Sequence, residues 1–425
     1  MTAQLTARFH SRLDEIDAAA WNALLPDDNP FLSHAFISGL EQHGCIRADY
    51  GWRAHHLALY RNEHLVAAAP LYLKRNSHGE YVFDWSWAGA YERAGLDYYP
   101  KLLCAIPYSP VTGARLLAGG GTDAAALREA LAAALAGTVE GAGLSSAHLN
   151  FVTASDAEAL DSASWLARFD WQFHWRNGGS GGRHWLSFDQ FLDALTHKKR
   201  KNIRHERAQV ARAGISCQIR DGNALTAAEW REIHELYLGT FAERGNHPAL
   251  TLGFFRHLGA TMPERTLAVL CRRGADIIAM ALLLRSSTTL YGRYWGCREN
   301  VPGLHFEACY YQGIQYCIDN GLHRFEPGAQ GEHKLARGFL PTRTRSYHYL
   351  ADPRFRAAVR EALAREAVAL EEYRSELMAH SPYAEPRTVP PEAADATAPA
   401  PGDRDGDRGS VRSRTGCRPD GKDTS

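Results

Sequence analysis

The sequence predicts a mixed α/β fold made of two similar halves and an unstructured tail. Three observations support this prediction. The chain has 425 residues, which is enough for two domains of ordinary size. With 45% hydrophobic and 23% charged residues, its composition is that of a soluble globular protein and excludes fibrous and wholly disordered classes. Predicted strands and helices also recur in the same order in the two halves.

Residues 1–190 are predicted to form the first domain. Helical periodicity of apolar residues identifies the helices, Thr122 is suited to cap the second of them, and runs of apolar residues identify the strands. The hairpin turns at Arg61-Asn62-Glu63. In order, we expect Phe31–Glu41 (helix), His55–Tyr60 and Val66–Lys74 (hairpin strands), Lys101–Ile106 (strand), Asp123–Val139 (helix) and Ala147–Val152 (strand).

Residues 191–380 are predicted to form the second domain, preceded by a basic helix. The expected elements are Ile215–Ile219 (strand), Ala227–Glu243 (helix), Leu267–Arg272 and Ile277–Leu284 (hairpin strands), Thr289–Trp295 (strand), Phe306–Asn320 (helix) and His323–Glu326 (strand). Many α/β proteins show this rhythm, so the pattern alone leaves duplication and a single α/β domain equally open.

Residues 381–425 are predicted to be disordered, because no aromatic residue, Leu, Ile or Met follows Tyr383. The eight cysteines include no CxxC pair, so we expect buried free thiols and neither a zinc site nor a disulfide framework. No signal peptide and no apolar run of membrane-spanning length is present, which predicts a cytoplasmic protein. No metal site is indicated.

The densest group of polar residues lies in the glycine-rich segment Phe325–Phe339, directly after a predicted strand. Loops at strand ends commonly bind substrates, because the strand fixes the backbone and the loop presents its side chains. We therefore predict that this segment carries catalytic or binding residues, and that a solvated loop of mutually paired ions is the alternative. The candidates are Glu326, Glu332, His333 and Lys334 as catalytic residues and Arg337 as a substrate-binding residue.

A second candidate lies on the strand before the Phe306 helix, where Arg293 and Trp295 are predicted to bind substrate. Strand alternation should place these two side chains on one face and Tyr294 on the other, so the three should not line one pocket. Glu307 in the first turn of the following helix has two equal interpretations, a site residue or a favourable partner of the helix dipole.

A third candidate is the basic segment from His197 to Arg212, which carries seven Lys and Arg against one acid, Glu206. In a chain of zero net charge this cluster indicates an anion-binding surface, with a solvated helix as the alternative. Arg200, Arg204 and Arg207 share one face at helical spacing. We predict that Lys198, Arg200 and Arg204 bind phosphates of a substrate.

Aromatic residues gather in the first half. They line a binding cleft or close a core, and the sequence favours neither. The predicted substrate-binding residues of this region are Trp85, Trp87, Tyr91 and Lys101.

Several long segments resemble the bacterial FemAB-like family, which is related to peptidoglycan biosynthesis and to the GNAT N-acyltransferases. They include PFLSHAFISGLEQHG, KKRKNIRHERAQV, HFEACYYQGIQYCI and FEPGAQGEHKLARGFLP, and the likeness spans roughly Phe31 to Pro353. The resemblance implies two acetyltransferase-like domains in tandem.

The resemblance also implies transfer of an acyl or aminoacyl group to an amine, with acyl-CoA or aminoacyl-tRNA as donor and no tightly bound cofactor. The acceptor is then a small molecule or a cell-wall precursor, and tRNA is a candidate partner. By analogy with coenzyme-binding turns of GNAT enzymes, Thr112, Gly113 and Arg115 are expected to hold a pyrophosphate. Two other classes stay open, a non-catalytic binder of precursors and a tRNA- or RNA-binding module.

The expected mechanism is direct attack of the amine on the activated acyl group. Glu326 is the first candidate base and Glu332 the second. Lys334 and His333 are expected to stabilise the negative oxygen of the tetrahedral intermediate, while Arg293 and Arg337 hold phosphate.

Overall fold

The computed structural model describes residues 4–161, 164–178, 183–243, 247–329 and 331–384. These residues fall within one compact unit, Met1–Val389. Most of the tail expected to be disordered, residues 385–425, lies outside the described residues. None of the described helices is long and apolar enough to cross a membrane.

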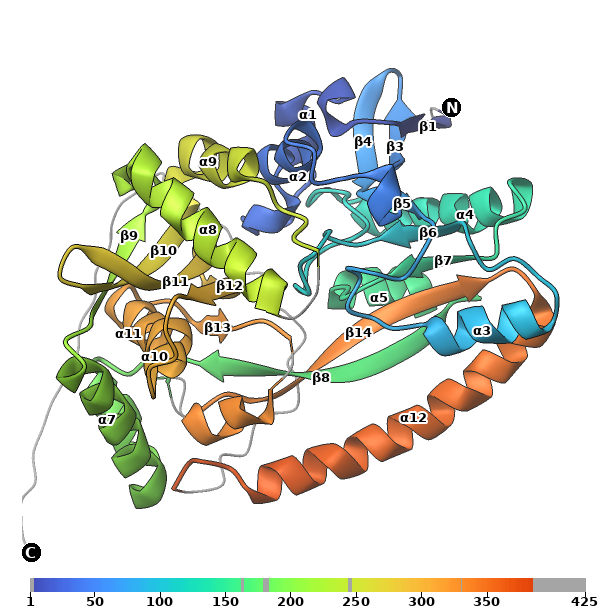
Figure 1. Cartoon of the computed structure of the whole chain (residues 1–425). Coiled ribbons are helices and arrows are strands. Elements are labelled where there is room, and N and C mark those ends of the chain that lie inside the picture. The colour runs from blue at the N-terminus through green and yellow to red at the C-terminus, as the bar shows by residue number, and fades with distance from the viewer. Residues whose placement is uncertain (1–3, 162–163, 179–182, 244–246, 330, 385–425) are drawn as a thin grey trace, which may run out of the picture. The chain divides into compact units, whose positions relative to one another are not determined.

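An eleven-stranded mixed sheet runs through both halves of the chain (Figure 1). Its order is β2 (Trp52–Ala54), β5 (Leu71–Lys74), β6 (Lys101–Cys104), β7 (Ser146–Leu149), β14 (Leu340–Leu350), β8 (Leu166–Arg176), β13 (Arg324–Glu326), β12 (Thr289–Cys297), β11 (Asp276–Arg285), β10 (Thr266–Arg273) and β9 (Ser216–Asp221). Parallel pairing occurs between β6 and β7 and between β12 and β13. The mixed α/β class expected from the sequence is confirmed.

The first-half hairpin differs from its expected form, because Val66–Lys74 is two strands and not one. Strands β3 (His56–Arg61) and β4 (His64–Ala69) form a separate three-stranded sheet with β1 (Leu5–His10), whereas β5 joins the main sheet. The break falls at Pro70, which has no backbone N–H to donate to a strand partner.

The helices pack against both sheets. Their bounds are α1 (Ala18–Asn22), α2 (His34–Gln42), α3 (Trp85–Arg93), α4 (Ala124–Gly141), α5 (Ala154–Asp161), α6 (Phe188–Asp193), α7 (His197–Arg212), α8 (Ala227–Glu243), α9 (Leu252–Thr261), α10 (Leu304–Phe306), α11 (Gln312–Asp319) and α12 (Pro353–Ala379). The predicted Phe306 helix corresponds to α10 and α11, which a π-helical turn at Glu307–Tyr311 joins. Such turns are frequent at functional sites.

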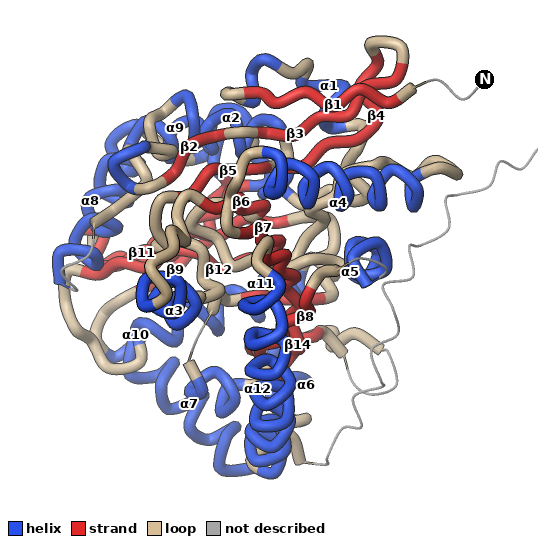
Figure 2. The backbone as a smooth tube through the Cα atoms, turned by 90° about the vertical axis from the view of Figure 1, so that its right-hand side faces the viewer, coloured by secondary structure: helices blue, strands red, loops and turns tan. Residues whose placement is uncertain are grey.

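The C-terminal part of the chain completes the first half of the sheet. Strand β14 lies between β7 and β8 and is antiparallel to both. The long helix α12 then runs alongside β8 and β14 (Figures 1 and 2). The expected domain boundary at residue 190 therefore falls within α6, between β8 and β9, which are strands of one continuous sheet.

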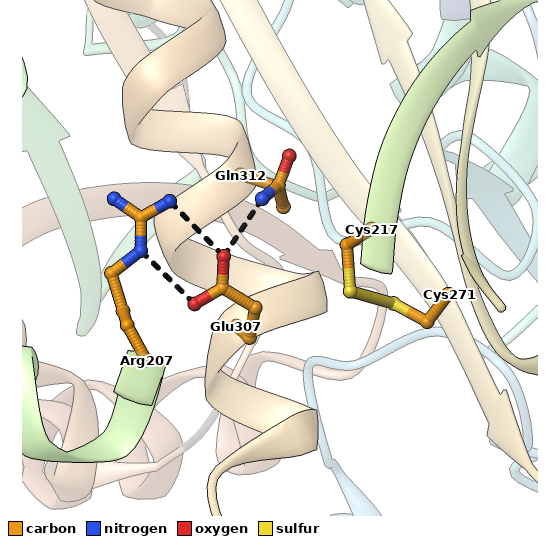
Figure 3. The surroundings of a disulfide bond; sticks show 5 residues. All are labelled: Arg207, Cys217, Cys271, Glu307 and Gln312. Carbon is orange, nitrogen blue, oxygen red and sulfur yellow. Dashed lines mark hydrogen bonds and ion pairs between the residues drawn. A yellow bond between two sulfur atoms is a disulfide. The ribbon is translucent and has the colours of Figure 1, made fainter. Parts of the chain in front are cut away.

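Two of the cysteines expected to be free are joined, so that expectation is wrong for Cys217 and Cys271 (Figure 3). These residues lie directly opposite each other on the antiparallel strands β9 and β10, with Cα atoms 4.1 Å apart. The sequence offers no sign of the bond, because 54 residues separate the cysteines and only strand pairing brings them together.

Reducing this disulfide is expected to lower the free energy of unfolding by about 2–4 kcal/mol, because the bond restricts a long loop of the unfolded chain. Urea unfolding with and without dithiothreitol measures the change. The reductant should have no effect on the Cys217→Ser/Cys271→Ser double variant. This variant should unfold at the same urea concentration as the reduced wild type. Equal midpoints for oxidised and reduced wild type would contradict the assignment.

Candidate functional site

The second half of the chain contains a cleft of about 520 Å³. It lies between strands β11 and β12, the loop after β13 and the π-helical turn, and one first-half residue, Tyr81, reaches its wall. Its polar and aromatic lining includes Tyr81, Arg293, Tyr294, Trp295, His305, Tyr310, His333 and Lys334. The cleft thus gathers residues from both candidate segments of the second half.

A β-bulge at Arg293 overturns the expected strand alternation. Leu282 pairs with Tyr294 and Leu283 pairs with Gly292, which leaves Arg293 as an extra residue on β12. A bulge re-aims the side chains around it. As a result, Arg293, Tyr294 and Trp295 all line the cleft, and the prediction that they could not do so is wrong.

Lys334 is a buried cation in the wall of the cleft. The six-residue 3₁₀ helix Glu332–Arg337 positions it, and its Nζ donates to the carbonyl oxygens of Gly328 and Ala329 at 2.7 and 3.0 Å. Burial, with the charge of Arg293, lowers the pKa of Lys334 to about 7. An ammonium has three hydrogens, so one remains for a substrate oxygen.

The neighbouring candidates His333 and Glu332 point in different directions. His333 lines the cleft, and its Nε2 lies 2.8 Å from the hydroxyl of Tyr310. Glu332 is exposed and accepts a hydrogen bond from Tyr373 on α12 at 2.6 Å. Because its side chain is exposed and held by α12, the geometry gives no support to Glu332 as a base.

Glu326 is buried at the end of β13, and Pro327, which follows it, lines the cleft. Its carboxylate lies 3.6 Å from Arg324 and 4.0 Å from the Nδ1 atom of His174. Burial raises its pKa, and the nearby arginines oppose that rise. Among the described residues, its Oε2 atom has no hydrogen-bond partner.

Arg337, expected to hold phosphate, is already paired. Its Nη2 and Nε atoms donate to the two carboxylate oxygens of Glu206 on α7 at 2.6 and 3.3 Å, and its guanidinium lies 3.3 Å from the ring centre of Phe306. Because these contacts occupy the charged group, the structure contradicts a phosphate-binding role for Arg337.

The basic segment forms helix α7, as expected, but acids on neighbouring elements offset part of its charge. Arg200 pairs with Asp193, Arg204 with Asp189 and Arg207 with Glu307. Figure 3 shows the Glu307 carboxylate held by Arg207 and Gln312, which gives this acid a structural role. Lys198, Lys201 and Arg204 keep exposed side chains on the helix surface.

The first-half candidates are separate from the cleft. Trp87 and Tyr91 are buried in a core with residues of β8, β14 and α12, so the core interpretation holds for them. Trp85 is 54% exposed and lines a different surface pocket. Lys101 is fully buried and pairs with Asp84 at 2.5 Å and Glu80 at 2.8 Å, so it is not available to substrate.

The Thr112 turn does not fit a pyrophosphate. The N–H of Gly113 donates to Phe151, and the backbone N–H of Arg115 donates to the carboxylate of Asp156. The fully buried Arg115 guanidinium donates to carbonyl oxygens of four residues, Val111, Gly113, Ala114 and Asn150. These donors of Gly113 and Arg115 hold the protein's own loop, so the geometry gives no support to a pyrophosphate site at Thr112, Gly113 and Arg115.

Sequence reasoning missed two residues near the cleft. Tyr81 belongs to a first-half loop and has a positive φ of 62°. His174 lies on β8, a strand that the sequence pattern does not predict. No local pattern marks either residue, because only the tertiary fold brings them to the second-half site.

The described residues form a mixed α/β fold with a polar cleft on the strands of its second half. A family model described as peptidoglycan biosynthesis/recognition, FemAB-like, matches residues 12–385, and the chain belongs to this family. No curated protein matches it.

Several solved structures are similar to this chain at low sequence identity. The C-terminal domain (DUF2156) of a protein from Agrobacterium fabrum named as a lysylphosphatidylglycerol synthetase is 12% identical, with a TM-score of 0.50 over 82% of this chain and 96% of that chain. FemX is 11% identical, with a TM-score of 0.46 over 84% and 100%. A tandem GNAT protein from the clavulanic acid biosynthesis pathway is 12% identical, with a TM-score of 0.44 over 82% and 99%.

Proposed function

We propose that the protein is an N-acyltransferase or aminoacyltransferase that uses the second-half cleft to move an acyl group from an activated ester or thioester to an amine. Family membership supports this class of reaction. The observation that carries the proposal is Lys334, a buried cation that lines the cleft with two of its hydrogens held by backbone carbonyls. The family description supports a peptidoglycan precursor as the acceptor.

In the proposed reaction the amine nitrogen attacks the acyl carbon, and the carbonyl oxygen becomes negative. Lys334 donates a hydrogen bond to that oxygen, and His333 on the same wall is the second donor. The carbon–oxygen or carbon–sulfur bond of the donor then breaks, and its leaving group takes up the proton that the amine gives up. Glu326, whose Oε2 has no partner among the described residues, accepts the proton of the amine through an ordered water.

For the donor we propose a charged tRNA, with an acyl-CoA as the other candidate. Helix α7 supports this choice, because Lys198, Lys201 and Arg204 expose cations that attract a polyanion. The loss of the expected pyrophosphate turn at Thr112 removes the first-half argument for a coenzyme.

The test is to incubate the purified protein with amine precursors and either charged tRNA or acyl-CoA, and to identify products by mass spectrometry. We expect product from charged tRNA. In the Lys198→Gln/Lys201→Gln/Arg204→Gln variant, the apparent affinity for tRNA should fall. The slope of the logarithm of the binding constant against the logarithm of the salt concentration should become shallower by roughly 2, because three phosphate contacts are removed.

Transfer from acyl-CoA alone would assign the chain to coenzyme-dependent acyl transfer. Binding of a precursor without any product would identify a non-catalytic binder. Either result would reject the proposed donor.

A further inference from the structure

Arg293 presents two hydrogen-bond donors that the protein does not use. Its Nη1 atom donates to the carbonyl oxygen of Gly292 at 2.6 Å. Its Nε and Nη2 atoms are buried and have no hydrogen-bond partner among the described residues. Leaving such donors unpaired is costly, so the site is suited to a group that is supplied from outside.

Other arginines of this chain show what that pair of atoms binds. Arg207 uses Nε and Nη2 to hold the two oxygens of Glu307 at 3.1 and 3.2 Å, as Figure 3 shows. Arg337 holds Glu206 with the same two atoms at 3.3 and 2.6 Å. These two donors lie side by side on one edge of the guanidinium and match a carboxylate.

The surroundings of Arg293 keep this edge fixed. The guanidinium lies 4.7 Å from the ring centre of Phe31 and 5.5 Å from that of Tyr291, so two aromatic rings support it. Its position on the bulge of β12 places the residue in the cleft wall together with Lys334. An anion bound here therefore lies in the same cavity as the proposed reaction.

We propose that Arg293 binds the carboxylate of the acceptor, so that the substrate is an amine that also carries a carboxylate, namely an amino acid or a short peptide. This inference rests on the proposed acyl transfer and specifies its acceptor. The reacting carboxyl group of an acyl ester or thioester is esterified and is not a free carboxylate. The carboxylate bound by Arg293 therefore belongs to the acceptor, the molecule that carries the amine. Nε and Nη2 are buried in this structure, so binding requires the carboxylate to gain access to them.

The inference is tested by binding without any donor. Isothermal titration of the full chain compares alanine and alanyl-alanine with their primary amides, and inorganic pyrophosphate serves as a phosphate probe. We expect the acids to bind and the amides to bind about 10- to 100-fold more weakly, because a hydrogen-bonded charge pair is lost. Arg293→Met should abolish the preference for acids, and Arg293→Lys should restore only part of it, because an ammonium lacks the paired donors.

Arg337→Met is the matched control. It removes an arginine that is already paired with Glu206, so the preference for acids should persist while the melting temperature falls. Arg293→Met removes a buried cation with two unused donors, and its melting temperature should fall less than that of Arg337→Met.

Equal binding of acids and amides, or no binding of acids at millimolar concentration, would overturn the inference. The inference would also be overturned if pyrophosphate bound in place of the acids and Arg293→Met no longer bound pyrophosphate. That result would assign the Nε and Nη2 atoms of Arg293 to a phosphate of the donor. Acid binding through Arg293 without acyl transfer would reject only the proposed function. Acyl transfer to acids and amides alike would reject only the carboxylate site.

Discussion

Replacing Lys334 with alanine is expected to lower kcat by about 100- to 1000-fold, the usual loss when one donor to a developing oxyanion is removed. The substitution removes a buried cation whose pKa burial already lowers to about 7, so the fold should remain intact. Steady-state kinetics with the donor found to be active measure the loss, and circular dichroism checks the fold. Activity equal to that of the wild type would remove Lys334 from the mechanism.

The pH dependence gives a second measure of the same residue. Only the charged ammonium provides a strong donor, and Lys334 loses its charge as the pH rises through about 7. We therefore expect a limb of falling kcat above about pH 7 in the wild type. Lys334→Arg should lack this limb, because an arginine keeps its charge. A limb that persists in this variant would belong to another group.

Replacing Lys101 with methionine is expected to lower the free energy of unfolding by about 3–5 kcal/mol. Its Nζ contacts Asp84, Glu80 and the hydroxyl of Ser77, all buried in the first half. Its loss leaves these carboxylates without their main cation, although burial already raises the pKa of Glu80 to about 7. Urea unfolding measures the change.

Lys198→Met on the exposed surface of α7 is the control, and its effect should stay within about 0.5 kcal/mol. A small effect at Lys101 would mean that water or a protonated acid replaces the ion pair. That result would contradict the structural role assigned to this residue.

The elements that the sequence predicted best are those whose own residues determine them. Helix α8 has the predicted bounds, and β10 and β11 differ from theirs by one residue at each end, because their apolar pattern is nearly continuous. Strands β8 and β14 went unpredicted. Polar residues are mixed along both, as in the TRTRSYH stretch of β14, and partners from distant parts of the chain cover them.

The candidate site was predictable only in part, and for a similar reason. The glycine-rich segment identified Lys334 and His333, since a polar loop after a strand is visible locally. The roles expected of Arg337 and Arg115 failed because each cation has protein partners that only the fold supplies. The bulge that brings Tyr294 to the same wall as Arg293 is a property of strand pairing, which single-strand alternation does not reveal.

The position of β14 affects how the chain acquires its structure. β7 and β8 are separated in the sheet by a strand from near the C-terminal end of the described chain, where Tyr347 pairs with both Leu149 and Ala167. During synthesis β7 and β8 therefore cannot pair with β14 until most of the protein has left the ribosome. Pairings between such distant segments form slowly and leave strand edges exposed meanwhile. A chain shortened before Leu340 would lack the strand that joins the two parts of its sheet.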